Sequence, residues 1–129
     1  MLTSALERAL KNEKLCYITT RDAKGKPGTV EIWFVWVDGK LYISTGAQSL
    51  KVRKLKVTPR AKVAIGKWKG PAIEGPVRIC SDEATVRKVI PLLAKKYGNY
   101  WGDAEEFVRT NLEGRTRVLL ECTPQNATS

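Results

Sequence analysis

The 129-residue sequence contains no histidine, and its three cysteines are far apart. Cys16, Cys80 and Cys122 form no C-x-x-C pair, so a metal site is not expected. We expect three buried thiols, and the spacing leaves open a single internal disulfide. Because the sequence offers no nucleophile paired with a base, it argues against acid–base or covalent catalysis by side chains alone.

Long hydrophobic runs are also absent. The longest wholly apolar run, Ile32 to Val37, is much shorter than the roughly 20 residues that cross a bilayer. The N-terminal residues MLTSALERALKNEK are amphipathic and contain no signal-peptide core. We therefore expect a cytoplasmic protein.

Acidic residues are outnumbered, with 13 Asp and Glu against 23 Lys and Arg, which gives a formal net charge of +10. This charge favours anionic partners such as nucleic acid, phosphorylated cofactors or acidic surfaces, without choosing among them. The length suits one domain with one core. We expect residues 1–124 to form that domain and residues 125–129 to form a flexible tail.

Six segments have the composition of β-strands, rich in β-branched and aromatic residues and bounded by turn residues. They are Leu15–Thr20, Thr29–Val37, Lys40–Thr45, Ala61–Trp68, Ala72–Ile79 and Arg115–Cys122. Asp38-Gly39 predicts a hairpin between the second and third strands. Gly75-Pro76 predicts a bulge or an edge position in the fifth strand.

Apolar residues at helical spacing predict four helices. One ends at Asn12, one covers Ala47–Val57, one runs from a cap at Ser81 or Asp82 to Gly98, and one covers Asp103–Leu112. These are too few crossover helices for a parallel sheet. The predicted fold is mainly β, within the α+β class: a six-stranded antiparallel split β-barrel with short flanking helices.

The predicted strand Thr29–Val37 has two different faces. One is entirely apolar and belongs in a core: Val30, Ile32, Phe34 and Trp36. The other is mixed, and we expect a partner subunit or a ligand to cover it: Thr29, Glu31, Trp33, Val35 and Val37.

The stretch from Leu41 to Pro59 reads as a strand that ends in hydroxyl residues, turns at Gly46 and enters a basic helix. Unpaired N–H groups and partial positive charge at a helix start suit a phosphate group. The side chains that add hydrogen-bond donors there are Ser44, Thr45, Ser49 and Lys51.

The segment VEIWFVWVDGKLYISTGAQSLKVRKLKVTPRAKVAI resembles the signature of the flavin-binding split-barrel family related to pyridoxamine 5'-phosphate oxidase. The shared features are an apolar strand, a DG turn, a strand ending in Ser/Thr, S-x-K-x-x-x-L and P-R-x-x-V. The resemblance extends more weakly from Leu6 to Pro124. It implies that the flavin phosphate is held by Ser44, Thr45, Ser49 and Lys51, and that the ring edge follows Glu31, Ile32, Trp33 and Phe34.

Members of this family often carry an arginine directly before the lysine, where this chain has Leu50. One phosphate-binding charge is therefore missing from the expected set. Arg115 and Arg117 open the last predicted strand and are further candidates. The remaining basic residues of the region are expected to be solvated: Arg53, Lys54 and Arg60.

The resemblance implies a homodimeric oxidoreductase with its cofactor at the subunit interface, FMN being preferred and a phosphorylated deazaflavin the alternative. The reaction would transfer two electrons between a reduced nucleotide cofactor and a small organic acceptor. Oxidation of pyridoxamine phosphate itself is not expected, because the family's extended C-terminus with its Arg and His residues is missing. Two other readings stay open: a flavin carrier without turnover, and a basic barrel that binds single-stranded nucleic acid on Trp33, Tyr42 and Trp68.

Overall fold

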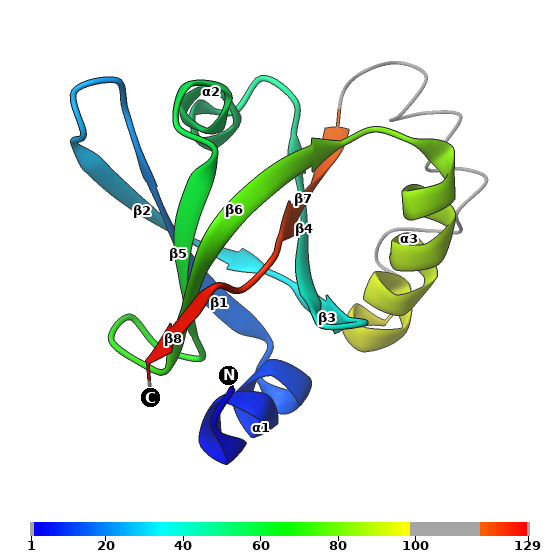
Figure 1. The fold of residues 1–129 in the computed structure, drawn as a ribbon. Coiled ribbons are helices and arrows are strands. Elements are labelled where there is room, and N and C mark those ends of the chain that lie inside the picture. The colour runs from blue at the N-terminus through cyan, green and yellow to red at the C-terminus, as the bar shows by residue number, and fades with distance from the viewer. Residues whose placement is uncertain (1, 99–116, 129) are drawn as a thin grey trace.

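The computed structural model describes residues 2–98 and 117–128. Three helices and eight strands lie in these ranges (Figure 1). In chain order they are α1 (Ser4–Asn12), β1 (Leu15–Arg21), β2 (Pro27–Trp33), β3 (Val35–Val37), β4 (Lys40–Gly46), α2 (Leu50–Val57), β5 (Arg60–Ile65), β6 (Ala72–Cys80), α3 (Glu83–Tyr97), β7 (Arg117–Cys122) and β8 (Asn126–Thr128).

The strands form one curled antiparallel sheet in the order β2-β1-β5-β6-β7-β4-β3, and β8 pairs with β6. The long strand β6 joins the two halves, because Ala72 to Pro76 pair with β5 and Val77 to Cys80 pair with β7. At this change of partner a side chain on Gly75 would collide with the carbonyl oxygen of Thr123. The glycine therefore allows the chain that follows β7 to lie close against β6.

The predicted split barrel is confirmed, but the prediction of six strands is wrong. The segment Thr29–Val37 is interrupted at Phe34, so β2 pairs with β1 while β3 pairs with β4. Residues 126–128, expected within a flexible tail, pair with Ala72 to Glu74 as strand β8. The predicted helix Asp103–Leu112 and the candidate Arg115 lie outside the described residues.

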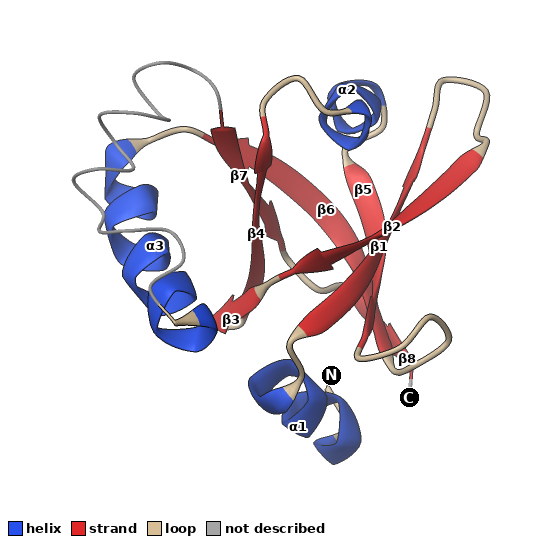
Figure 2. Cartoon of the chain, turned by 180° about the vertical axis from the view of Figure 1, so that it is seen from behind, coloured by secondary structure: helices blue, strands red, loops and turns tan. Residues whose placement is uncertain are grey.

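Two apolar cores hold the fold together. Inside the half-barrel, Leu6 and Leu10 of α1 and Val52 and Leu55 of α2 pack with the inward side chains of the strands. The second core lies between α3 and the strands β3, β4 and β7, and includes Val86, Val89, Ile90 and Leu93. Figure 2 shows α1 and α2 at opposite ends of the half-barrel and α3 along its flank.

The two expected faces of Thr29–Val37 are only partly confirmed. Phe34 is completely buried, whereas Val30 is 45% exposed because β2 is an edge strand of the sheet. On the other face, Val35 and Val37 are buried beneath α3 of the same chain, so they need no partner subunit or ligand. The residues of that face that lie on β2 are Thr29, Glu31 and Trp33.

All three cysteines are buried free thiols, so the internal disulfide left open by the sequence does not form. Burial raises the pKa of Cys16 to about 12, and those of Cys80 and Cys122 to about 11. These thiols are inert packing groups at neutral pH. None of the described helices is long and apolar enough to cross a membrane.

A buried carboxylate joins three strands. Glu121 on β7 accepts hydrogen bonds from the Tyr42 hydroxyl (2.8 Å) and from two nitrogens of Arg78 (3.2 Å each). Lys40 lies 3.5 Å away. Hydrogen bonding from Arg78 is the main reason that the pKa of Glu121 is lowered, so its stabilisation is present at neutral pH and is lost as the pH falls through that pKa.

Removing the Tyr42 hydroxyl tests this network. We expect Tyr42→Phe to lower the free energy of unfolding by about 1.5–3 kcal/mol, because a buried carboxylate loses a donor. Tyr17→Phe is a matched control, since its hydroxyl bonds to Glu31 at the surface, and should cost less than about 0.5 kcal/mol. Urea titrations measure the free energy of unfolding of both variants. Equal losses of this free energy in Tyr42→Phe and Tyr17→Phe would contradict a stabilising role for the Glu121 network.

Candidate functional site

The end of β4 and the start of α2 form a tight junction. β4 ends in Ser44, Thr45 and Gly46, and the Ser49 N–H donates to the Gly46 carbonyl (3.1 Å) to close the turn. The predicted helix start at Ala47 is wrong, because α2 begins at Leu50 with Ser49 as its N-cap residue. The N–H groups of the first helical turn therefore face the same region as the hydroxyl residues of β4.

The Ser49 hydroxyl is the most informative atom of this junction. It is shielded from solvent, has no hydrogen-bond partner among the described residues, and does not cap α2 as an N-cap serine usually does. A buried hydroxyl without a partner costs about 1–3 kcal/mol. An acceptor atom of a ligand placed beside Ser49 could take this hydrogen bond.

A pocket of about 450 Å³ opens at this junction, within the size range of small-molecule sites. Seven of the eight residues predicted from the sequence line it: Glu31, Ile32, Trp33, Ser44, Thr45, Ser49 and Lys51. They come from β2, β4 and α2, which are separated in the sequence. Leu15, Gly46 and Arg117 complete the lining.

Phe34 is the predicted residue that does not line the pocket. Its side chain is completely buried, and its backbone N–H donates to the Tyr97 hydroxyl at 3.0 Å. Its carbonyl oxygen accepts from Lys96 at 3.0 Å and lies 2.8 Å from the Tyr97 hydroxyl. The polar groups of Phe34 are therefore engaged by α3.

Arg117 was only a further candidate in the sequence, and the structure places it in the pocket wall. Its guanidinium donates to the Ser44 hydroxyl (3.2 Å) and to the Ser44 carbonyl (3.1 Å). β7 brings it there, because Arg117 pairs with Gly46. Leu50, where the family often has arginine, is 63% exposed on α2. Arg117 therefore brings a positive charge from another strand.

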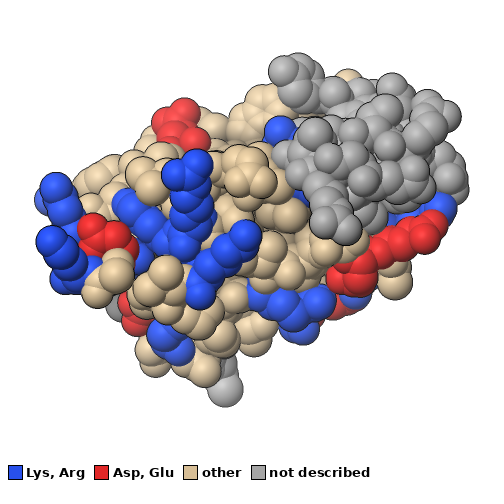
Figure 3. All heavy atoms as spheres, turned by 90° about the horizontal axis from the view of Figure 1, so that it is seen from above, with Lys and Arg blue, Asp and Glu red and all other residues tan. Residues whose placement is uncertain are grey.

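Positive charge collects at this end of the molecule. Figure 3 shows Lys and Arg side chains gathered over the end where α2 lies. Lys51 forms no ion pair with any described residue, and its pKa is lowered by burial and then by repulsion from Arg117. The repulsion between Lys51 and Arg117 makes this wall of the pocket suited to an anionic ligand.

The opposite wall of the pocket has a different character. Glu31 accepts a hydrogen bond from the Tyr17 hydroxyl (2.9 Å). The Trp33 ring stacks on Tyr97, with ring centroids 4.3 Å apart and planes 2° from parallel. This wall offers an aromatic surface and the backbone of β2, whereas the β4–α2 wall offers hydroxyls and cations.

The residues expected to stack on single-stranded nucleic acid do not share a surface. Tyr42 is buried against Glu121, Trp33 stacks on Tyr97, and Trp68 is 58% exposed with its ring edge against Tyr17. The structure therefore offers no continuous stacking platform among the described residues. No cluster of potential metal ligands occurs among them either.

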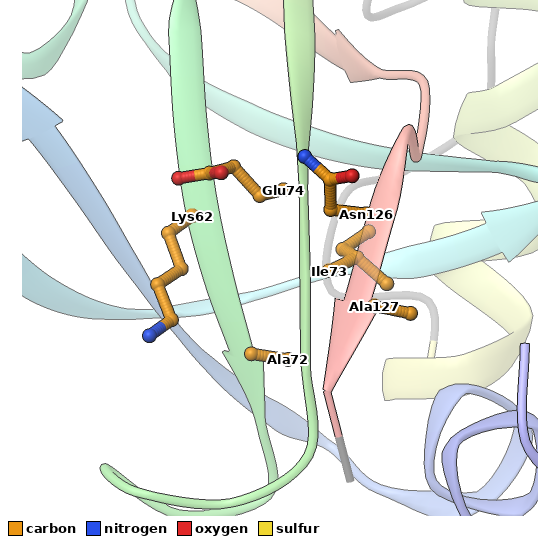
Figure 4. A pocket seen from close by; sticks show the side chains of 6 residues that line it. All are labelled: Lys62, Ala72, Ile73, Glu74, Asn126 and Ala127. Atoms are coloured by element: carbon orange, nitrogen blue, oxygen red, sulfur yellow. The ribbon is translucent and has the colours of Figure 1, made fainter.

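Other hollows lie on the outer face of the sheet. The pocket in Figure 4, between β5, β6 and β8, measures about 110 Å³ and is too small for a nucleotide cofactor. A second hollow of about 560 Å³ lies beside Tyr17 and Trp68. Neither is lined by the hydroxyl residues of the β4–α2 junction.

The family model described as pyridoxamine 5'-phosphate oxidase matches residues 2–128. No curated protein sequence matches the chain.

Several solved structures share the fold. A conserved hypothetical protein from Mycobacterium tuberculosis is 18% identical, with a TM-score of 0.76 over 98% of this chain and 84% of its own. An F420 reductase is 17% identical, with a TM-score of 0.75 over 98% of both chains. A pyridoxamine 5'-phosphate oxidase homologue from Listeria innocua is 17% identical, with a TM-score of 0.71 over 95% and 92%.

The repulsion between Lys51 and Arg117 gives a stability prediction. We expect Lys51→Met to melt at or above the wild-type temperature in ligand-free buffer, because it removes a partly buried cation beside another cation. Lys54→Met on the same helix should melt at or below it, because Lys54 is attracted to Asp22. Thermal unfolding followed by circular dichroism checks both. A clear loss of stability in Lys51→Met alone would contradict this account.

Proposed function

The chain belongs to the pyridoxamine 5'-phosphate oxidase family, and we propose that it binds a phosphorylated flavin-type cofactor, preferably FMN, in the pocket between β2 and the β4–α2 junction. The observation that carries this proposal is the shielded Ser49 hydroxyl, which has no hydrogen-bond partner among the described residues and lies in the same pocket as the cations Lys51 and Arg117. A phosphate group would provide an acceptor for the Ser49 hydroxyl and a negative charge beside Lys51.

The phosphate end of the cofactor would be held by the β4–α2 wall. Ser49 and Thr45 supply hydroxyl donors, Lys51 supplies an ammonium group, and the first turn of α2 supplies backbone N–H groups. Arg117 is already oriented by its two hydrogen bonds to Ser44, so it loses little freedom on binding.

The ring end would lie along β2. Because β2 is an edge strand of the sheet, its outer edge has backbone N–H and C=O groups that no described strand pairs with. Glu31, Ile32 and Trp33 bring this edge to the pocket. Such alternating donors and acceptors can read the polar pyrimidine end of a flavin-type ring. Phe34, predicted as a fourth contact, contributes by holding the end of β2 in place.

A bound flavin supplies the two-electron chemistry itself, and the protein binds and orients it. This fits a chain without histidine and without a pair of acid–base groups in the described pocket. We propose an oxidoreductase that transfers two electrons between a reduced nucleotide cofactor and a small organic acceptor. A carrier that binds the cofactor without turnover would use the same pocket.

A phosphorylated deazaflavin is the second candidate cofactor, supported by the fold shared with the F420 reductase. Both ligands carry a phosphate and a flat tricyclic ring, so the same walls serve either. The absorbance spectrum of the purified protein separates them: two flavin bands indicate FMN, and a single deazaflavin band at shorter wavelength indicates the alternative. Steep, salt-dependent binding of single strands with no affinity for either cofactor would overturn both.

We further propose that the protein is a homodimer that uses the outer face of the sheet. None of the described helices covers the outer face of β1, β2 and β5 (Figures 1 and 2). Trp68 is 58% exposed there, beside Tyr17. A large exposed aromatic residue next to a hollow is typical of an interface. The cofactor pocket borders this face at Glu31, which the Tyr17 hydroxyl contacts.

Loss of the Lys51 charge tests the phosphate assignment. We expect Lys51→Ala to weaken FMN binding by about tenfold to a hundredfold, because one charge-assisted contact is lost. Lys54→Ala, on the same helix but outside the pocket lining, should bind within about twofold of the wild type. Flavin fluorescence quenching gives both affinities. Unchanged FMN binding by Lys51→Ala would contradict the assignment of the phosphate to this junction.

The dimer proposal is tested by placing a charge on the outer face. We expect the wild type to elute as a dimer and Trp68→Arg to shift toward monomer, because an unpaired charge would be buried in the interface. Val57→Arg is a control at a 63% exposed position on α2 and should remain dimeric. Light scattering coupled to size exclusion measures the mass. A monomeric wild type at micromolar concentration would contradict the proposal.

A further inference from the structure

A second cavity, of about 510 Å³, adjoins the proposed cofactor pocket at Trp33, whose side chain lines both. Its other lining residues are Lys14, Lys95, Lys96, Tyr97 and Gly98, and we call it the lysine pocket. Three of the six residues are cations, and none of the described lining residues is acidic. The lysine pocket therefore carries a positive field beside the aromatic wall of the cofactor pocket.

Lys96 differs from an ordinary surface lysine. Lysines in the last turn of a helix offset the helix dipole, which accounts for the exposed Lys95. Lys96 instead turns toward the sheet: its Nζ donates to the Phe34 carbonyl at 3.0 Å and lies 3.7 Å from the centre of the Phe34 ring. It forms no ion pair with any described residue.

Burial of Lys96 carries an electrostatic cost. Burial lowers its pKa to about 8, while Cys16 and Glu13 raise it slightly and Lys14 lowers it. The Glu13 side chain lies beside Gly66 and makes no ion pair with Lys96. The ammonium has three N–H groups, and the Phe34 carbonyl accepts from one of them. The others can bind an acceptor in the cavity.

The aromatic wall of the lysine pocket is fixed in position. Tyr97 stacks on Trp33, and its hydroxyl lies 2.7 Å from the Lys14 carbonyl and accepts from the Phe34 N–H at 3.0 Å. Because these contacts tie α3 to the end of β2, the cations and the aromatic surface stand in a defined arrangement. A preorganised wall of this kind lowers the cost of ordering the site on binding.

We infer that the lysine pocket anchors the carboxylate, or another oxyanion, of the small organic substrate that exchanges electrons with the cofactor. The substrate class is therefore an organic anion with a flat, apolar part. The inference rests on the proposed function, because the cofactor pocket lies across Trp33 and receives the reacting end of the substrate. Lys96 binds the anionic group, and Trp33 and Tyr97 contact the flat part.

Binding of a simple anion tests the lysine pocket without any cofactor. We would titrate the full chain, labelled with ¹⁵N, with benzoate and with benzamide, its neutral counterpart of similar shape. The Trp33 indole signal, identified with a Trp33→Phe sample, reports binding. We expect saturable shifts with benzoate and at least tenfold weaker binding of benzamide. Equal binding of the two, or no shift with benzoate, would overturn the inference.

Variants assign the effect to Lys96. Lys96→Met keeps the side chain packed over Phe34 and removes the charge, so benzoate binding should weaken at least tenfold. Lys96→Arg keeps the charge and should bind within about fivefold of the wild type. Lys11→Met, at an exposed lysine of α1 outside both pockets, should behave as the wild type. Unchanged benzoate binding by Lys96→Met would overturn the assignment.

A parallel FMN titration separates the two proposals. If Lys96→Met binds FMN as the wild type does but loses benzoate, both proposals stand. If the wild type binds benzoate selectively but binds neither FMN nor a deazaflavin, the proposed function fails and the anion site stands alone. If the wild type binds FMN but does not distinguish benzoate from benzamide, the lysine pocket has no such role.

Discussion

The hydrogen bonds between the backbone of Phe34 and two side chains of α3 are the constraint on which the rest of the structure depends. The backbone N–H and C=O of this residue leave the sheet ladder and are bound by Tyr97 and Lys96. A buried backbone that leaves a ladder needs such partners. Because of this interruption, one continuous segment pairs with β1 through β2 and with β4 through β3. This pairing curls the sheet into a half-barrel. It also directs Trp33 to the pocket and Val35 toward α3.

The candidate site follows from this curl. It brings the edge strand β2 opposite the β4–α2 junction, so one wall presents an aromatic ring and the outer edge of β2, and the other presents hydroxyls and cations. The wall of hydroxyls and cations carries two costs in the ligand-free chain: the shielded Ser49 hydroxyl has no hydrogen-bond partner among the described residues, and Lys51 is held near Arg117. Natural proteins keep such costs mainly where a ligand offsets them. The same arrangement places Lys96 on the far side of Trp33.

Much of this could be predicted from the sequence, because the deciding signals are local. The β-branched and aromatic runs, the Asp38-Gly39 turn and the hydroxyl residues before a basic helix act within a few residues of one another. They led to the split barrel and to Ser44, Thr45, Ser49 and Lys51, and the family resemblance added three more of the residues that line the same pocket: Glu31, Ile32 and Trp33. What was missed depends on distant partners. The break at Phe34 needs Tyr97, and the burial of Val35 needs α3. Arg117 enters the pocket because β7 pairs with β4, which no local pattern reports.

We propose above that the β4–α2 junction binds the phosphate of a flavin-type cofactor. The most direct measurement compares the affinity of the purified chain for FMN and for riboflavin, which has the same ring and lacks the phosphate. Ser49, Lys51 and Arg117 line the junction side of the pocket and would all contact that one group, so we expect FMN to bind at least about a hundredfold more tightly. Equal affinities for the two ligands would contradict it.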